Sequence, residues 1–155
     1  MSSNPYAQFT GVPMDSDEID DLLTTQGYGI LSLCRGGEPY SIPISFGYDG
    51  DHVYFGLLEA SPNPRKMEYI DDGVTARLLV TDINGRFEWQ SVAVTGPVRS
   101  IDPDSEEWDH FMDTLDDNAW FARSFERSDA IESIQGWELQ IGELTGIERT
   151  EEVYD

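Results

Sequence analysis

Helical spacing of apolar residues occurs early in this chain of 155 residues, at Ile19, Leu22 and Leu23. Side chains at i, i+3 and i+4 share one face of a helix, so this stripe predicts an amphipathic helix. Asp15 precedes the stripe and is a suitable N-cap, and Gly27 is a plausible end point. Residues 1–14, before the helix, are expected to be a loose lead-in.

From Tyr28 onward the pattern changes to strand-like segments, several with alternating apolar and polar residues. Arg35–Glu38 and Asp49–Gly50 are typical hairpin turns, and Asn84–Gly85 indicates another. Gly96–Pro97 predicts a bulge or bend within a long strand. We therefore expect about six strands, over residues 28–34, 39–48, 53–58, 74–81, 86–101 and 137–149.

Helices are expected between some of these strands. Prolines interrupt the chain before a short helix over residues 65–71. Asp102–Pro103 has the cap and the first-turn proline that start a helix, and a helical patch follows at about 120–125. The longer helix carries its apolar stripe at Trp108, Phe111, Met112 and Leu115. Residues 102–136 would then form a helical insertion before the last strand.

The order of these elements predicts one mainly-β domain over residues 1–155, with flanking helices and no internal repeat. Most strands are joined by short hairpins, so neighbouring strands run antiparallel. Closure into a small barrel removes the exposed edges that an open sheet would leave. The expected fold is therefore a six-stranded antiparallel barrel.

The charge of the chain is extreme, because 9 basic residues stand against 31 acidic ones and the formal net charge is −22. The acidic residues are spread through the sequence, which indicates a whole surface built for concentrated salt and not an acidic tail. At 1 M salt the field of such charges reaches only about 3 Å. We expect a cytoplasmic protein of a salt-accumulating halophile, and an acidic protein of a mesophile is the alternative.

The same charge argues against nucleic acid and anionic membranes as partners, because phosphate contacts need cations. The sequence contains no apolar run of about 18 residues. It also contains no signal-peptide pattern. A soluble protein that is not exported by the usual route is expected.

Neither the cysteine nor the histidines predict a catalytic or metal site. Cys34 is the only cysteine, and its apolar neighbourhood suggests a small buried hydrophobic residue. A single cysteine also excludes an internal disulfide. His52 in a hairpin turn and His110 beside an aspartate are interpreted as ordinary solvated positions, so that no metal is expected. Any chemistry must then come from a bound cofactor.

Three segments could line a pocket for a flat, phosphorylated ring. In the first, Pro43 has no backbone donor, so strand pairing is interrupted and Ser45 can contact a ligand; the alternative is an edge strand with a tolerated proline. In the second, Gly56 lets a ligand approach the backbone. Arg65 and Lys66 follow at a helix start and could hold a phosphate, or could merely offset nearby carboxylates.

The third segment, Trp89–Gln90–Ser91, offers an aromatic face and two polar groups on a strand. Its alternative is a core tryptophan flanked by surface polar side chains. Lys66 has a further significance, because it is the only lysine of the chain. Against so many carboxylates, a dianionic phosphate needs a local positive charge to be held.

Five short segments also carry a resemblance to a known family: Gly29–Leu33, Glu38–Phe46, Val53–Phe55, Arg65–Lys66 and Trp89–Val92. Their order and spacing resemble the pyridoxamine 5'-phosphate oxidase-like family of FMN-binding split barrels, most closely its small nitroimidazole-reductase-like members. The resemblance covers residues 15–101 well and residues 137–149 more loosely. It implies a six-stranded split barrel that forms a homodimer, with two FMN sites at the subunit interface.

The resemblance implies four sets of FMN contacts. The isoalloxazine would be lined by Ile44, Ser45 and Phe46, and the ribityl chain by Phe55, Gly56 and Leu57. The phosphate would be held by Arg65 and Lys66, and the flavin would be closed over by Trp89, Gln90 and Ser91. In relatives this last segment often comes from the partner chain. No catalytic acid or base is required, because a flavin accepts hydride at its own ring. The substrate-facing wall is expected from residues 103–115 and 120–125.

Two departures from the family limit the implied activity. Many relatives have a histidine after the aromatic residue of the third strand, where this chain has Gly56, and this weakens a role in nitroimidazole reduction. The acidic segment Thr150–Asp155 contains no histidine, unlike the vitamin-forming oxidase, so pyridoxamine phosphate is not the expected substrate.

The leading hypothesis is an FMN-dependent oxidoreductase that passes electrons from a reduced nicotinamide or flavin donor to a small-molecule acceptor. One alternative is a flavin carrier or redox sensor without turnover. Another is the same fold with the deazaflavin coenzyme, whose longer acidic tail would prefer more cations than this pocket offers. A haem-binding variant is disfavoured, because neither histidine is placed as an axial ligand.

Overall fold

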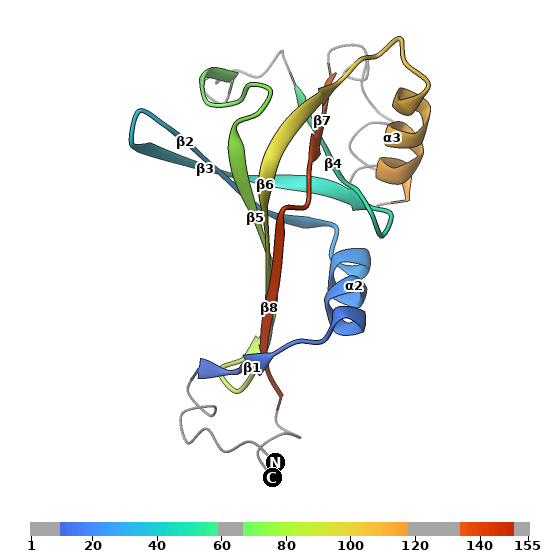
Figure 1. Ribbon diagram of the computed structural model, residues 1–155. Helices are drawn as coiled ribbons and strands as arrows, with labels where there is room; N and C mark the ends of the chain where they lie inside the picture. Colours follow the sequence, from blue (N-terminus) through green and yellow to red (C-terminus); the bar gives the residue numbers. More distant parts are fainter. Residues whose placement is uncertain (1–9, 59–66, 118–133, 151–155) are drawn as a thin grey trace.

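The computed structural model describes residues 10–58, 67–117 and 134–150. The strands in these ranges are β1 (Val12–Pro13), β2 (Tyr28–Arg35), β3 (Glu38–Tyr48), β4 (Val53–Leu58), β5 (Thr75–Gly85), β6 (Glu88–Ile101), β7 (Ile134–Leu139) and β8 (Glu143–Arg149). The helices are α2 (Ser16–Thr25) and α3 (Glu107–Asp116). Figure 1 shows α2 beside the lower part of the long sheet and α3 at the upper end, next to β4.

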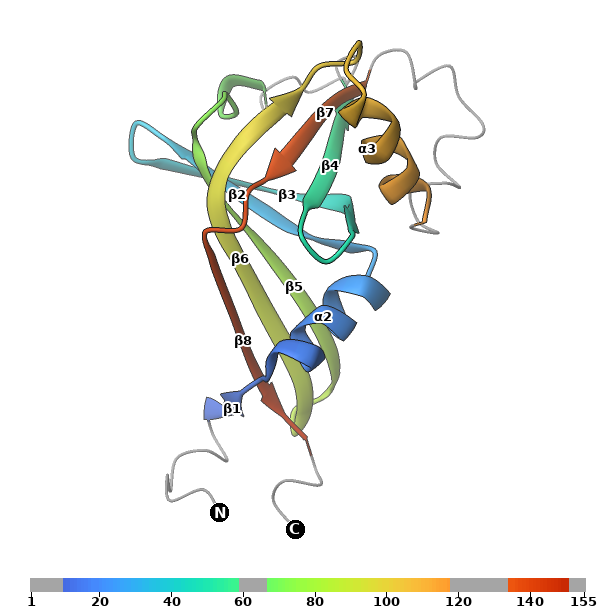
Figure 2. The same ribbon diagram turned by 45° about the vertical axis from the view of Figure 1, so that its right-hand side comes forward.

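Six strands close into an antiparallel barrel in the order β6-β5-β2-β3-β4-β7, and β7 pairs back onto β6. The remaining two strands extend the sheet, because β8 pairs with the first part of β6 and carries β1 on its other edge. Figure 2 shows this extension running down from the barrel beside α2. The prediction of a mainly-β fold built on a six-stranded antiparallel barrel is confirmed.

The long strand β6 changes its partner at Gly96–Pro97, where a bend was predicted. Before this point Thr95 pairs with Glu143 of β8, and after it Val98 pairs with Leu139 of β7. A Cβ atom at Gly96 would lie 1.8 Å from the carbonyl oxygen of Gln140, so only glycine fits here. The prediction of a single strand over residues 137–149 is therefore wrong. The chain leaves β6 after Leu139, at the end of β7, and pairs with it again from Glu143 as the separate strand β8.

Glycine conformations confirm two of the predicted hairpins. Gly36 and Gly37 have φ of 58° and 79°, and Gly50 has φ of 101°, which is the left-handed region that such turns require. The turn predicted at Asn84–Gly85 is wrong. Both residues lie in β5, where the register shifts, and the turn comes after them, at Arg86–Phe87.

Phe87, in this turn, has a cation on its ring from two different parts of the chain. The guanidinium carbons of Arg86 and Arg149 lie 4.4 and 4.2 Å from the centroid of its ring. Cation–π contacts of this kind contribute about 0.5–1 kcal/mol each at exposed sites. This tip of the sheet is therefore held by contacts between residues distant in sequence.

The first helix forms as predicted. Asp15 caps α2, and its side chain accepts the amide hydrogen of Glu18 at 2.8 Å while the Glu18 carboxylate accepts that of Asp15. The apolar stripe is buried against the sheet. Residues 1–14 are not wholly a loose lead-in, because Val12 and Pro13 pair with β8 as strand β1.

The other helix predictions need correction. α3 begins at Glu107 and not at Pro103, because Asp102 starts a tight turn that comes before the helix: its carboxylate accepts the amide hydrogen of Asp104 at 2.9 Å and its carbonyl accepts that of Ser105 at 3.0 Å. Of the helix expected over residues 65–71, the described part contains only a 3₁₀ turn at Met67. The patch at 120–125 lies outside the described residues.

Apolar side chains pack in two clusters. The larger one fills the barrel and the space under α2. The smaller one joins α3 to β4 and β7 through Tyr54, Phe111 and Ile134. Cys34, expected to be buried, is exposed, because the alternation of β2 turns Leu33 inward and Cys34 outward. No helix among the described residues has the length and apolar character needed to cross a bilayer.

Candidate functional site

The barrel opens between β3 and β4. Their ladder contains only the pairs Phe46↔Phe55, Gly47↔Tyr54 and Tyr48↔Val53. Beyond this point β3 continues alongside β2, and β4 continues alongside β7. The two strands therefore part at the pair Phe46↔Phe55, and we call the gap between them the β3–β4 opening.

Ser45 lies at the edge of the β3–β4 opening. The amide of the next residue, Phe46, donates to the carbonyl of Gly27 at 3.1 Å, on the β2 side. Because successive residues of a strand direct their backbone groups to opposite edges, the amide and carbonyl of Ser45 face the β4 side. Pro43, two residues earlier, has no amide hydrogen there. A ligand in the opening could therefore meet backbone groups of β3.

The predicted residues of β3 and β4 come together at the opening, but most of their side chains point away from it. Ile44 and Phe46 are 8% and 1% exposed and belong to the core of the barrel. Phe55 and Leu57 are likewise 0% and 3% exposed. Contacts from these four residues to a ligand would come from the backbone, whereas the side chain of Ser45 is half-buried.

The structure gives Gly56 a role in packing. A Cβ atom there would lie 2.3 Å from Cδ1 of Ile134 on the paired strand β7. The missing side chain therefore makes room for Ile134 of the smaller core, and the space beside it is not free for a ligand. Arg65 and Lys66, the predicted phosphate contacts, lie outside the described residues.

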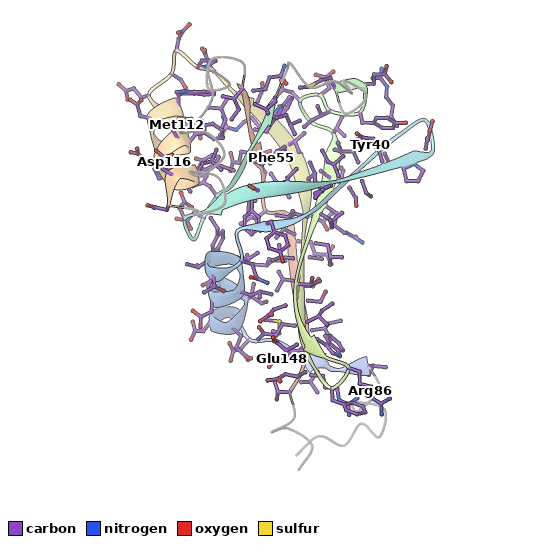
Figure 3. All side chains as sticks on the ribbon, turned by 180° about the vertical axis from the view of Figure 1, so that it is seen from behind. Tyr40, Phe55, Arg86, Met112, Asp116 and Glu148 are labelled. Atoms are coloured by element: carbon purple, nitrogen blue, oxygen red, sulfur yellow. The ribbon has the colours of Figure 1, made fainter. Side chains whose placement is uncertain are left out.

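The segment Trp89–Ser91 does not lie at the β3–β4 opening of its own chain. It begins β6 and pairs with residues 81–83 of β5 and 147–149 of β8. The side-chain amide of Gln90 donates to Glu148 at 3.0 Å. In Figure 3, Phe55 lies in the barrel and Glu148 at the opposite end of the sheet. The structure thus brings together the β3 and β4 segments but not this third one.

One face of the sheet exposes a series of large apolar side chains. They come from neighbouring strands, with exposed fractions of 50% for Tyr28, 39% for Ile30, 40% for Leu79, 70% for Ile83 and 46% for Ile147. The register places Ile30 directly opposite Leu79. We call these five residues the apolar sheet face. Ser91 pairs with Ile147 and so lies at this face.

A cavity of about 470 Å³ lies where β6 ends and β7 begins. It is lined by Ser100, Ile101, Asp102, Pro103, Ile134, Gln135, Gly136 and Trp137. Small-molecule sites commonly measure about 300–1,000 Å³. The cavity borders the start of the segment that was expected to form the substrate-facing wall.

A cluster of ionisable side chains beside α3 was not predicted from the sequence. His52 and His110 both hydrogen-bond to Asp49, so they are not ordinary solvated positions. Burial alone would raise the pKa of the Asp49 carboxyl, but hydrogen bonds from both histidines and from the amides of Asp51 and His52 lower it well below its usual range. The contact between Asp49 and His52, three residues apart, could have been predicted from the sequence. The contact of His110 with Asp49 could not, because it depends on how α3 packs in the fold.

A barrel opened between two adjacent strands, with β3 backbone groups facing the gap, defines a split barrel. The family model for pyridoxamine 5'-phosphate oxidase matches residues 15–148, and the chain belongs to this family. The resemblance inferred from the sequence is thereby confirmed. A curated relative, the uncharacterized protein RA0666 of Rhizobium meliloti, is 22% identical over 88 residues, which are 57% of this chain and only 56% of that protein.

Solved structures share the fold. A FAD-binding protein from Mesorhizobium loti has a TM-score of 0.67 and 22% identity, over 90% of this chain and 98% of its own. The FAD and haem binding protein from Mycobacterium smegmatis has a TM-score of 0.66 and 23% identity, over 87% of this chain and 71% of its own. A candidate 5-nitroimidazole antibiotic resistance protein from Bacteroides thetaiotaomicron has a TM-score of 0.59 and 17% identity, over 87% of this chain and 85% of its own. At these identities the likeness is one of fold.

Proposed function

We propose that the protein is an FMN-binding flavoprotein whose cofactor lies along the β3–β4 opening. The observation that carries this proposal is the parting of the two strands after Phe46↔Phe55, in a chain of the pyridoxamine 5'-phosphate oxidase family. Two of the solved relatives are named for FAD, so a flavin is the cofactor class that the comparisons favour. Arg65 and Lys66 follow β4 in sequence and supply cations for a terminal phosphate, which suits FMN.

We further propose that the apolar sheet face joins two copies of the chain. Contiguous exposed apolar side chains mark association surfaces more often than free surface. A two-fold interface uses the same patch on both copies. Such pairing could bring Trp89 and Ser91 of one copy to the flavin of the other, which agrees with their distance from the opening of their own chain. Gln90 could contribute only its backbone there, because its side chain bonds to Glu148 on the other face of the sheet.

The proposed activity is electron transfer from a reduced nicotinamide or flavin donor to a small acceptor. A bound flavin supplies the redox chemistry at its ring, so the chain needs only to bind, orient and shield it. The cavity beside Pro103 and Trp137 is a candidate place for the acceptor. Steady-state oxidation of NADH with quinones or nitro compounds distinguishes this activity from that of a carrier or sensor, which would bind flavin without turnover.

Absorption spectroscopy of the purified protein tests the cofactor directly. We expect a yellow protein that releases FMN on denaturation, identified by mass. Release of FAD would retain the flavin proposal and correct the choice of cofactor. A colourless protein that binds neither flavin in molar KCl would overturn it.

Lys66→Ala tests the phosphate contact. Loss of a charge-assisted hydrogen bond should weaken FMN binding by roughly 1.5–3 kcal/mol, measured by fluorescence titration. Lys66→Arg should retain most of the affinity, because it keeps the positive charge. Equal affinities for Lys66→Ala and the unaltered protein would refute this role.

Leu79→Glu tests the interface, because it places a charge at the centre of the apolar sheet face. We expect a monomer by light scattering and a loss of flavin binding. Thr24→Glu, an equal change on the exposed side of α2, should affect neither. A Leu79→Glu variant that stays dimeric would contradict the proposed surface.

A further inference from the structure

Three side chains with metal-binding atoms meet between the β3–β4 turn and α3. Oδ2 of Asp49 lies 2.8 Å from Nδ1 of His52 and 2.6 Å from Nε2 of His110. All three ligand atoms lie within 4.8 Å of one another. Two imidazole nitrogens and one carboxylate oxygen form a donor set that zinc and its late first-row neighbours take readily. A chance group of surface acids would not provide the two nitrogens.

Asp49 is held in one orientation by the turn that contains it. Its other oxygen, Oδ1, accepts the amide hydrogens of Asp51 at 2.8 Å and of His52 at 2.6 Å. Both bonds use the oxygen that faces the turn, so Oδ2 is directed toward the two imidazoles. Hydrogen bonds that orient a ligating side chain are a regular feature of metal sites.

The two imidazole rings are also held in place. The ring of His52 stacks on Tyr54 with centroids 5.3 Å apart and planes 7° apart. His110 meets the edge of the same ring at 5.8 Å and 82°. Tyr54 is fully buried, and its hydroxyl donates to Glu107 at 3.1 Å. The aromatic contacts therefore fix which ring nitrogens face Asp49 without occupying those nitrogens.

The spacing is close to what a metal ion needs. Zn²⁺ binds imidazole nitrogen at about 2.0–2.1 Å and carboxylate oxygen at about 2.0–2.2 Å in tetrahedral sites, which separates two ligand atoms by about 3.3 Å. Each ring nitrogen would therefore move away from Asp49 by roughly 0.5–0.7 Å. The two imidazole nitrogens, which lie within 4.8 Å of each other, would have to reach the same separation by side-chain rotation. The side chains of His110 and His52 are 53% and 37% exposed, so water can take a fourth position.

The geometry points to a binding site for a divalent late transition metal, with Zn²⁺ as the reference ion, formed by Asp49, His52 and His110. The site would fasten the β3–β4 turn to α3, two elements more than 55 residues apart in sequence. The site does not rest on the flavin proposal, because none of its three residues is a predicted FMN contact. The competing interpretation is a pair of plain histidine–carboxylate hydrogen bonds without metal affinity.

Zn²⁺ titration of the chelator-treated protein, at about pH 8 where unperturbed imidazole is neutral, tests the site. A fluorescent zinc chelator would serve as the competitor. The expected result is one tightly bound Zn²⁺ per chain and a rise in melting temperature. His110→Ala should lower the affinity by at least the roughly 10–100-fold that loss of an outer-shell partner costs. Since the His110 side chain is largely exposed, this variant should fold, which circular dichroism would verify.

Two controls separate the site from general attraction of cations to an acidic surface. Asp109→Asn removes one exposed charge from the same helix and should leave Zn²⁺ affinity unchanged. Asp49→Asn keeps an oxygen for the turn amides but removes the charged ligand, and should weaken binding. In addition, Co²⁺ bound to the unaltered protein should show the visible bands of a nitrogen-ligated ion, and these bands should be absent in His52→Ala.

Several outcomes would overturn the assignment. One is equal Zn²⁺ affinity of the unaltered protein and the His52→Ala/His110→Ala double variant. A second is displacement of Zn²⁺ by Mg²⁺ at equal concentration, which would indicate binding to carboxylates alone. A third is one ion per two chains, which would place the metal between copies and not within this cluster.

Discussion

Arg99, near the end of β6, joins two carboxylates from different elements. Its Nη2 lies 2.7 Å from Oε2 of Glu107 on α3 and 2.6 Å from Oε1 of Glu138 on β7, and its Nε adds a 3.1 Å bond to Glu138. The side chain of Glu138 is only 8% exposed, whereas that of Glu107 is 31% exposed. Glu138 therefore depends on Arg99 for compensation of its charge, and Arg99→Met tests that dependence.

The expected cost of Arg99→Met follows from this geometry. Removing one partner of a fully buried ion pair costs about 3–5 kcal/mol, because the remaining charge is left uncompensated. Arg99 itself is 39% exposed, so water reaches the pair and reduces the loss. We therefore expect Arg99→Met to lower the free energy of unfolding by about 2–3 kcal/mol.

The double variant Arg99→Met/Glu138→Met separates the pair from the packing of its members. It removes both charges, and replacement of a buried ion pair by apolar residues is often neutral. The double variant should therefore be less destabilised than the sum of the single variants by at least about 1 kcal/mol. Glu107 retains a hydrogen bond from Tyr54 at 3.1 Å, so its charge stays partly compensated in both.

Urea unfolding at fixed protein and salt concentrations measures these differences. The protein concentration is fixed because the stability of any dimer depends on it. Equal slopes of unfolding free energy against urea concentration would show that all variants expose the same amount of surface on unfolding. Strictly additive single and double variants would refute the coupling. So would a cost below about 0.5 kcal/mol for Arg99→Met, since surface changes without specific partners fall in that range.

Three further predictions concern pH, packing and salt. The hydrogen bond to Glu148, with burial, raises the pKa of Glu18 from 4.5 to about 7. The resulting stabilisation is complete below pH 4.5 and is lost as the pH rises through about 7. The free energy of unfolding of the unaltered protein, relative to that of Glu18→Gln, should therefore fall by about 1 kcal/mol over this pH range, and a constant difference would contradict the prediction. Gly96→Ala should cost about 1–3 kcal/mol, because its Cβ would lie 1.8 Å from the Gln140 carbonyl, whereas Gly85→Ala, with nothing within 4 Å, should be neutral. The melting temperature should rise from dilute to molar KCl, since screening contracts to about 3 Å around a charge of −22; no rise would refute adaptation to salt.

Local signals predicted the parts of the fold that local contacts decide. The Asp15 cap and its reciprocal bond with Glu18 place the start of α2. Gly36, Gly37 and Gly50 carry the positive φ that their turns require. In each case a residue's own conformational preference, or a partner three residues away, determines the outcome. Such features can be read from a sequence without knowledge of the rest of the molecule.

Features that depend on distant partners were not predictable in the same way. β7 and β8 are separate strands because β6 exchanges one for the other beside Gly96, whereas the alternating apolar residues Trp137, Leu139 and Ile141 predict one continuous strand. Phe87 in the turn after β5 contacts Arg149, more than 60 residues later. The cluster of Asp49 with His110 needs α3 to lie against the β3–β4 turn. Tertiary contacts override local propensity at each of these places.

The candidate flavin site shows the same limit at the level of the assembly. Sequence resemblance groups the β3, β4 and Trp89–Ser91 segments in one site, but a single chain brings only the first two together. The third lies among residues 81–83 and 147–149, beside the apolar sheet face. If all three serve one flavin, the third must come from another copy, and the dimer is then part of the site. Leu79→Glu should in that case abolish flavin binding, while Lys66→Ala should weaken it without dissociating the dimer, and this difference separates a site shared between chains from one that a single chain completes.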